Sequence, residues 1–148
     1  MTRAVNTALA GSGGVLQVVQ ETLTSTVTFT STTVVSTGLS ASITPSSSSS
    51  KVLVLLNGGS FDYAGSGPSR GNIYLYKNSS LLVFLSQKAV GSPTWALPYS
   101  EAYLDSPATT SSITYAIYGS NGAAAATNFL FNNSFGSRAT LTLMEIAG

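Results

Sequence analysis

Apolar and hydroxyl side chains alternate along much of this chain, and this alternation limits its possible folds more than any other feature does. Leu39, Ala41 and Ile43 are separated by serines, and residues 113–118 and 139–144 repeat the pattern. A period of two puts neighbouring side chains on opposite faces of a β-strand, so each segment predicts a strand with one buried face. No helical period persists long enough to build a layer of helices. The chain is therefore expected to be all-β.

Turn-forming residues separate the alternating segments and set the expected architecture. Residues 45–50, 57–59 and 65–68 are rich in Pro, Gly, Asn or Ser and predict turns or loops. The continuous apolar run 51–57 is typical of a central strand that is covered on both faces. The expected strands are residues 15–20, 24–30, 39–44, 51–57, 73–77, 81–86, 94–104, 113–118, 123–131 and 139–146, with 73–77 and 81–86 forming a hairpin joined at 78–80.

Many short strands with turns between them predict a single β-sandwich domain over residues 15–148, most simply a jelly roll. Residues 1–14 differ from the rest, because they are weakly apolar and end in the flexible sequence Gly-Ser-Gly-Gly. We expect them to form an extended N-terminal arm. The arm would bind a partner surface or a neighbouring subunit through Met1, Arg3, Val5 and Leu9, or would pack on its own domain.

The composition removes most of the groups that enzymes use. The 148 residues include no histidine and no cysteine, so the chain cannot build a Ser-His-Asp or Cys-His arrangement or the usual zinc site. We therefore expect a protein that is not an enzyme, with no catalytic residue, no cofactor and no metal. The one alternative is a glycan hydrolase that uses Glu101 and Asp105 as a carboxylate pair. Otherwise these two residues would be ordinary surface charges or a turn cap.

Charge is unusually scarce. Only 7% of the residues are charged, against roughly 25% in ordinary soluble domains. Either hydroxyl groups solvate the surface, or an assembly buries much of it; we expect an assembly. A net charge of +1 with scattered basic residues argues against nucleic acid as the partner, and no apolar run is long enough to span a membrane.

Aromatic residues gather in the middle third of the chain. Exposed tyrosine and tryptophan can stack on sugars or anchor an interface, so Tyr63, Trp95 and Tyr99 are candidate contacts for a glycan or a partner. Tyr74 and Tyr76 share one face of a predicted strand, opposite Ile73 and Leu75, and one of these two pairs would face outward. Packing in the core or between subunits is the alternative for all of these rings.

Four stretches occur in a set order: residues 14–20, residues 37–45 with the serine run and 51–54, residues 103–110, and residues 140–146. Together they cover the chain from Gly14 to its end, and this ordered set resembles a domain in virion proteins of tailed bacteriophages, of the type common in phages of cyanobacteria and other marine bacteria. The resemblance implies a trimeric jelly roll similar to the tumour-necrosis-factor and complement-type heads. By analogy with those heads, Leu141, Leu143, Tyr115 and Ile117 are candidates for the trimer interface.

That family often places the domain at the end of tail fibres, but this chain has only the short arm where a fibre would have a shaft. We therefore predict a homotrimeric capsid decoration (cement) protein on the outer shell of the virion. Its partners would be itself and the major capsid protein or another virion protein. The alternative is the receptor-binding tip of a tail fibre, which would recognise a host surface glycan through Tyr63, Trp95 or Tyr99.

Overall fold

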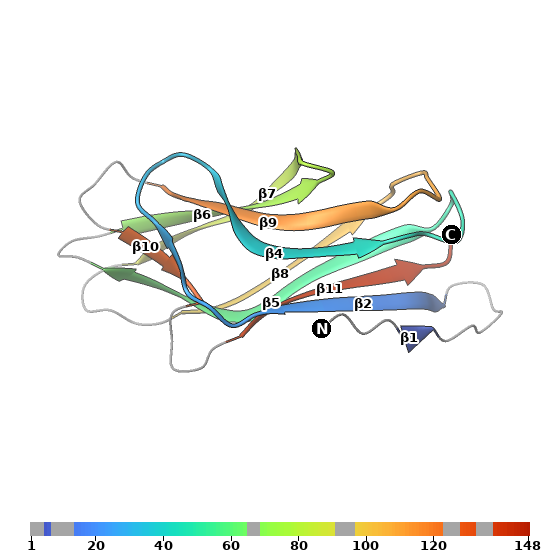
Figure 1. Ribbon diagram of the computed structural model, residues 1–148, viewed down its shortest axis with the longest axis horizontal. Coiled ribbons are helices and arrows are strands. Elements are labelled where there is room, and N and C mark those ends of the chain that lie inside the picture. The colour runs from blue at the N-terminus through green and yellow to red at the C-terminus, as the bar shows by residue number, and fades with distance from the viewer. Residues whose placement is uncertain (1–4, 7–13, 65–68, 91–96, 123–127, 133–137) are drawn as a thin grey trace.

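The computed structural model describes residues 5–6, 14–64, 69–90, 97–122, 128–132 and 138–148, and this described part of the chain is made of strands without a helix (Figure 1). The strands are β1 (Val5–Asn6), β2 (Val15–Leu23), β3 (Val27–Phe29), β4 (Val35–Ile43), β5 (Lys51–Ala64), β6 (Ser69–Lys77), β7 (Ser80–Val90), β8 (Leu97–Asp105), β9 (Ile113–Asn121), β10 (Asn128–Phe131) and β11 (Ala139–Ile146).

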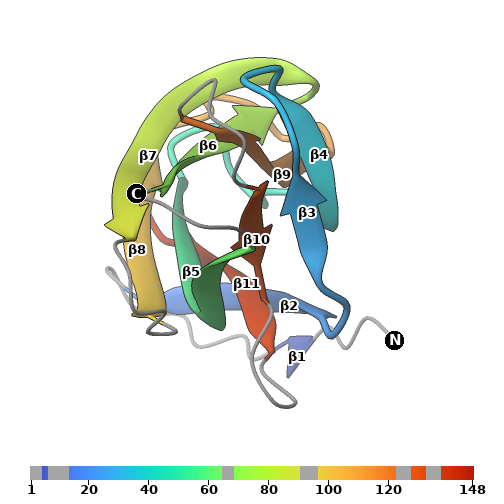
Figure 2. The ribbon, with the colours of Figure 1, turned by 90° about the vertical axis from the view of Figure 1, so that its left-hand side faces the viewer.

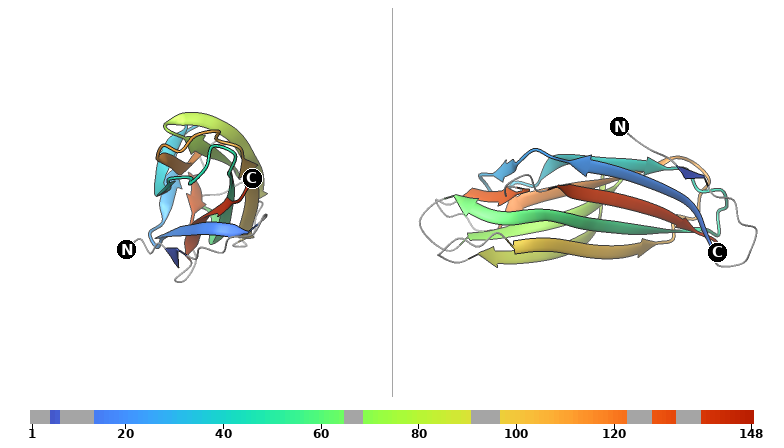
Figure 3. Two further views of the ribbon diagram at one scale, coloured as in Figure 1. Left: turned by 90° about the vertical axis from the view of Figure 1, so that its right-hand side faces the viewer. Right: turned by 90° about the horizontal axis from the view of Figure 1, so that it is seen from below.

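The strands form two antiparallel sheets that enclose one core (Figure 2). The larger sheet has the order β1-β2-β11-β5-β10-β3, and β8 pairs with the other side of β5. Figure 3 shows β2, β11, β5 and β8 side by side when the molecule is seen from below. The smaller sheet has the order β4-β9-β6-β7. The predicted all-β sandwich is confirmed, and this strand order is compatible with a jelly roll.

The period of two correctly predicts which side chains enter the core. In β4 every second residue from Thr37 to Ile43 is buried, and in β3 Phe29 is buried while the threonines beside it are exposed. Other strands of both sheets follow the same rule. Their buried residues include Val52, Val54, Leu56, Ile73, Leu75, Ile113, Tyr115, Ile117, Leu141 and Leu143.

One end of the core is aromatic. The Phe61 ring packs edge-on against Tyr99 at 4.6 Å between centroids, and it stacks on Phe129 at 5.0 Å. The Phe129 ring also lies over Gly71 of the smaller sheet, where a Cβ atom would overlap it. Glycine at position 71 therefore lets the two sheets approach each other around these rings.

The turn predicted at residues 57–59 is wrong, because β5 continues through it as a β-bulge. Gly58 and Gly59 have φ angles of 76° and 71°, and the pairing of β5 with β8 changes register between Asn57 and Ser60. The Gly59 amide donates to the carbonyl of Arg138 at 2.7 Å. Glycine adopts this left-handed backbone at little cost, so the strand bends without ending.

The hairpin predicted from residues 73–86 is confirmed. Strands β6 and β7 pair directly, with Lys77 opposite Ser80, so Asn78 and Ser79 form a two-residue loop. Their φ angles of 47° and 69° are those of the turn that suits the twist of a hairpin.

Candidate functional site

The outer face of the larger sheet carries three rows of uncharged side chains, which we call the neutral face. Strand register aligns the first row as Leu104, Leu53, Met144 and Val18 across β8, β5, β11 and β2. The neutral face comprises Leu53, Leu55 and Asn57 of β5, Thr140, Thr142 and Met144 of β11, Val18, Gln20 and Thr22 of β2, and Ser100, Ala102 and Leu104 of β8.

The first row of the neutral face is apolar and open to solvent in this chain. Leu104 is 50% exposed, and Leu53, Met144 and Val18 are half-buried. The run 51–57 was expected to be covered on both faces, but only the inward side chains of β5 are fully buried. The second face of this central strand therefore remains available for contact.

Two carboxylates of the larger sheet point inward, away from the neutral face. Asp105 at the end of β8 is 7% exposed, and Glu145 near the end of β11 is 1% exposed. Burying a carboxylate is unfavourable unless hydrogen bonds compensate. Both residues have such partners, supplied by other parts of the chain.

Asp105 joins the two sheets. Its Oδ2 atom accepts from Lys77 Nζ of β6 at 2.9 Å and from the Tyr115 hydroxyl of β9 at 2.6 Å. Burial raises the pKa of Tyr115, and its hydrogen bond to the Asp105 carboxylate raises it further. The tyrosine therefore remains a proton donor, and the cluster acts as a polar connection between the sheets.

Glu145 is held by the serine-rich segment that follows β4. The amide and the hydroxyl of Ser46 both donate to Glu145 Oε1 at 2.6 Å. Burial alone would raise the pKa of this carboxyl, but the hydrogen bonds outweigh it and hold the pKa below its ordinary value. Part of the serine run is thus a partner for a buried charge as well as a turn.

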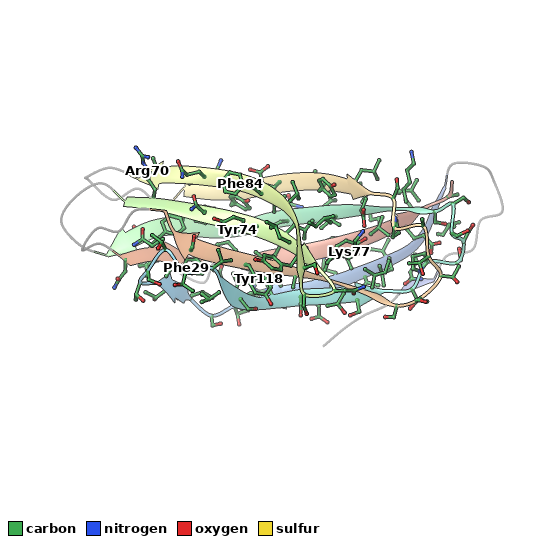
Figure 4. All side chains as sticks on the ribbon, turned by 90° about the horizontal axis from the view of Figure 1, so that it is seen from above. Phe29, Arg70, Tyr74, Lys77, Phe84 and Tyr118 are labelled. Atoms are coloured by element: carbon green, nitrogen blue, oxygen red, sulfur yellow. The ribbon has the colours of Figure 1, made fainter. Side chains whose placement is uncertain are left out.

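The outer face of the smaller sheet carries aromatic side chains, unlike the neutral face of the larger sheet. Tyr74 and Tyr76 point outward from β6, since the alternating Ile73 and Leu75 are completely buried. The Tyr76 ring stacks on Tyr118 of β9 at 4.0 Å between centroids, with the planes 24° apart. In Figure 4 Tyr74 and Tyr118 lie on this sheet, with Arg70 and Lys77 at the two ends of β6.

A pocket of about 430 Å³ opens on this face beside Tyr118. It lies between β4, β9 and the turn that joins β6 to β7. Its lining consists of Ser36, Ser40, Asn78, Ser79, Thr114, Ala116 and Tyr118, none of which is charged. Sequence reasoning missed this pocket; the only local signal was the positive-φ tendency of Gly38 and of the Asn-Ser turn.

The side chains proposed for the trimer interface lie in the core of a single chain. Leu141, Leu143, Tyr115 and Ile117 each have a relative exposure of 0%. They face the opposite sheet, so these side chains cannot themselves touch another subunit. The residues that alternate with Leu141 and Leu143 on β11, Thr142 and Met144, are the ones on the outer face.

The three predicted glycan contacts do not form one exposed group. Tyr99 is 2% exposed, packs on Phe61, and accepts a hydrogen bond from Ser86 at 3.2 Å. Burial raises the pKa of its hydroxyl. Trp95 and the side chain of Tyr63 lie outside the described residues. Tyr99 is therefore a core residue with a polar tip.

The described part of the arm pairs with its own domain. Val5 and Asn6 of β1 lie opposite Val18 and Gln17 at the edge of β2. Met1, Arg3 and Leu9 lie outside the described residues.

Glu101 and Asp105 do not have the geometry of a glycosidase pair. They are four residues apart on the extended strand β8, a separation of about 13 Å along the chain. Paired catalytic carboxyls lie about 5.5 Å apart in retaining enzymes and about 6.5–9.5 Å apart in inverting ones. In addition, Lys77 and Tyr115 already engage Asp105.

The described residues contain no group of three acidic, histidine or cysteine side chains that could hold a metal ion. Nor does this part of the chain contain a helix with the length and apolar character needed to cross a membrane.

No protein-family model matches this chain, and no curated protein sequence matches it. Among solved structures it is similar to a chain in the structure of the infectious bursal disease virus Gx strain, with 12% identity over 90% of this chain and a TM-score of 0.28. The match spans 43% of that viral chain. At this TM-score the likeness is weak and carries no argument about function.

Proposed function

We propose that this chain is a non-enzymatic structural protein of a virus particle, a homotrimeric decoration protein on the outer capsid surface of a tailed bacteriophage. The observation that carries the proposal is the neutral face, whose first row exposes Leu104 and leaves Leu53 and Met144 half-covered. The ordered sequence stretches that resemble phage virion domains support the same assignment. Such a protein acts by binding to other virion proteins, which requires no catalytic group.

The placement of charge supports a covered neutral face. A sheet face that stays in water normally carries polar and charged residues. Here the larger sheet turns Asp105 and Glu145 inward, while none of the residues of the neutral face is charged. The nearest outward charge on β5 is Lys51, at the beginning of the strand.

A second copy of the chain is the occupant that we assign to the neutral face. A symmetric oligomer repeats the same residues around its axis, so a charged contact face would bring like charges together. A neutral face with an apolar row avoids this repulsion and gains from burying Leu104, Leu53 and Met144. The strand order β2-β11-β5-β8 over β4-β9-β6-β7 fits the trimeric jelly-roll heads that the sequence resembles.

Sedimentation velocity tests the trimer directly. The proposal expects one species of three times the chain mass of 15.1 kDa at micromolar concentration. A stable monomer under these conditions would contradict the trimer.

The outer-shell role has its own test. Deletion of residues 1–13 should abolish attachment to purified phage shells if the arm anchors the protein, and the shortened trimer should remain intact because β2 to β11 are retained. A deletion protein that forms trimers and binds shells as well as the full chain would exclude the arm as the anchor.

The alternative is the tip of a tail fibre that binds a host glycan. The hydroxyl-lined pocket beside Tyr118 favours it, although this pocket is separate from the aromatic residues expected for that role. Virions imaged with a labelled antibody separate the two locations. Label over the whole head supports decoration, and label confined to fibre ends supports the tip.

A further inference from the structure

We infer that the pocket on the smaller sheet is a binding site for a neutral saccharide of one or two sugar rings. This site lies on the sheet opposite the neutral face, and the inference does not depend on the proposed assembly. It rests on how the pocket is built, on the groups that line it and on the absence of charge among them.

A bulge in β4 creates the space. Ser36 pairs with Tyr118 and Ser40 pairs with Ala116, so three residues of β4 lie opposite a single residue of β9. The buried Thr37 hydroxyl donates to the Ile117 carbonyl at 2.8 Å, and Gly38 has a φ angle of 82°. The bulge is therefore fixed by a specific hydrogen bond, and bulges of this kind often adjoin functional sites.

The turn of the β6–β7 hairpin forms the opposite wall and is fixed to β9 as well. The Asn78 amide donates to the Thr114 carbonyl at 2.9 Å, and the Thr114 amide donates to Asn78 Oδ1 at 3.0 Å. With both walls tied to the same strand, the pocket exists before a ligand binds. Preformed pockets lose less entropy on binding than those that must be ordered.

The lining suits a sugar. Five hydroxyl groups and the amide of Asn78 line the pocket, and hydroxyls can both donate to and accept from the hydroxyls of a saccharide. Two of the five also have hydrogen bonds within the protein, because Ser36 Oγ accepts from the Gly38 amide and Thr114 Oγ1 is bonded to Ser42.

The Tyr118 ring supplies an apolar wall for the C–H face of a sugar ring. Stacking on Tyr76 holds this ring in place. The volume of about 430 Å³ lies in the usual range for small-ligand sites.

The lack of charged residues in the lining disfavours anionic ligands of similar size. A phosphate or an acidic sugar is usually bound by arginine or lysine, and no such residue lines the pocket. The nearby Lys77 is held by Asp105 on the inner side of the sheet. The chemistry therefore favours a neutral saccharide over a nucleotide or a sialylated glycan.

The test is a titration of the isotopically labelled full chain, followed by the amide resonances of Ser40, Thr114 and Ala116. The probes are glucose, galactose, mannose, N-acetylglucosamine, lactose and maltose, with inorganic phosphate and glucuronic acid as charged controls. At least one neutral sugar should shift these resonances with a Kd on the order of 1 mM. The two anions should leave them unchanged.

A matched pair of variants locates the site. Ser40→Leu puts bulk into the pocket and should weaken sugar binding at least tenfold. Thr44→Leu adds similar bulk just past the end of β4, outside the lining, and should bind as the original chain does. Tyr118→Phe, which keeps the ring, should change the Kd less than twofold.

Absence of any resonance shift with all six neutral sugars at about 50 mM would overturn the inference, because a Kd well above that concentration is too weak for a specific binding site. Equal effects of Ser40→Leu and Thr44→Leu would also overturn it. Sedimentation of the same samples keeps the two proposals apart. A monomer that binds sugar contradicts the trimer alone, and a trimer that ignores sugar contradicts only the saccharide site.

Discussion

Both sheets of the sandwich have the same alternation of inward and outward residues, but their outward positions carry different kinds of side chain. On the neutral face of the larger sheet the outward positions are aliphatic or neutral polar, and the row through Leu53 is apolar. On the smaller sheet the outward positions hold tyrosines on β6 and β9 and a pocket beside the β4 bulge. A neutral face with an apolar row suits a broad contact with protein, and a pocketed aromatic face suits a small ligand. Under the two proposals, a low charge content would serve two kinds of binding.

The largest expected effect comes from placing a charge on the neutral face. Leu53→Lys should convert the proposed trimer to monomer, because burying an unpaired ammonium at a subunit contact costs about 4 kcal/mol. Sedimentation velocity measures the change, and circular dichroism should show that the monomer stays folded. Tyr74→Lys puts the same charge on the other face and should remain trimeric. Trimer loss in both variants would remove the distinction between the faces.

The second effect concerns how closely the sheets approach. Gly71→Ala should lower the free energy of unfolding by about 3 kcal/mol, since the added methyl group overlaps the buried Phe129 ring. Gly38→Ala is a useful comparison, because a Cβ there meets no atom within 4 Å and only the φ angle of 82° is unfavourable. That variant should lose about 1 kcal/mol. Chemical denaturation of both proteins gives the difference, and equal losses would argue against tight packing at Gly71.

The third effect tests why the larger sheet turns its carboxylates inward. Glu145→Gln should lower the free energy of unfolding at pH 7 by about 2 kcal/mol, because the charge-assisted hydrogen bonds from Ser46 are weakened. Glu101→Gln makes the same change at a half-buried position on β8 and should cost less than about 0.5 kcal/mol.

The same residue predicts an acid dependence. The folded protein lowers the pKa of Glu145 below its ordinary value of 4.5, so its contribution to stability is complete above that pH. The contribution is lost as the pH falls through the lower pKa of the folded state. The free energy of unfolding, measured by denaturation at several values between pH 7 and 3, should therefore fall more steeply with decreasing pH for the original chain than for Glu145→Gln. Parallel curves would show that Glu145 contributes no linkage.

The smallest effect concerns the rings of the smaller sheet. Tyr76→Ala should cost about 1 kcal/mol, because it removes the stack on Tyr118 from an exposed face. Tyr76→Phe keeps the ring and should be nearly neutral. Thermal unfolding measures both, and an equal loss in the two variants would assign the effect to the hydroxyl group.

Local sequence patterns predicted most of the strands and their buried faces, because the two-residue period depends only on neighbouring residues. They also predicted the hairpin at Asn78. The same local reasoning read Gly58 and Gly59 as a turn, since glycines favour both turns and bulges. Continuous pairing of β5 with β8, β11 and β10 determines that they form a bulge.

The candidate sites were less accessible to sequence reasoning. Leu141 and Leu143, which were predicted to lie at a trimer interface, are on the inward face of β11. The sequence around Tyr99 is consistent with an exposed aromatic residue. Its burial depends on packing against Phe61, which is distant in the sequence. The pocket depends on β4, β9 and the β6–β7 turn together, so no single segment carries its signal.

The sequence by itself determined that the chain is all-β, that alternate residues enter the core and that histidine and cysteine are absent. These properties follow from composition and from the geometry of a single extended strand. The tertiary structure decided which neutral side chains align into a face, that Ser46 meets Glu145 across 99 residues, and that β4 bulges beside Tyr118. Each of these depends on strand register, which is set by long-range packing and hydrogen bonds between segments that are far apart in the chain.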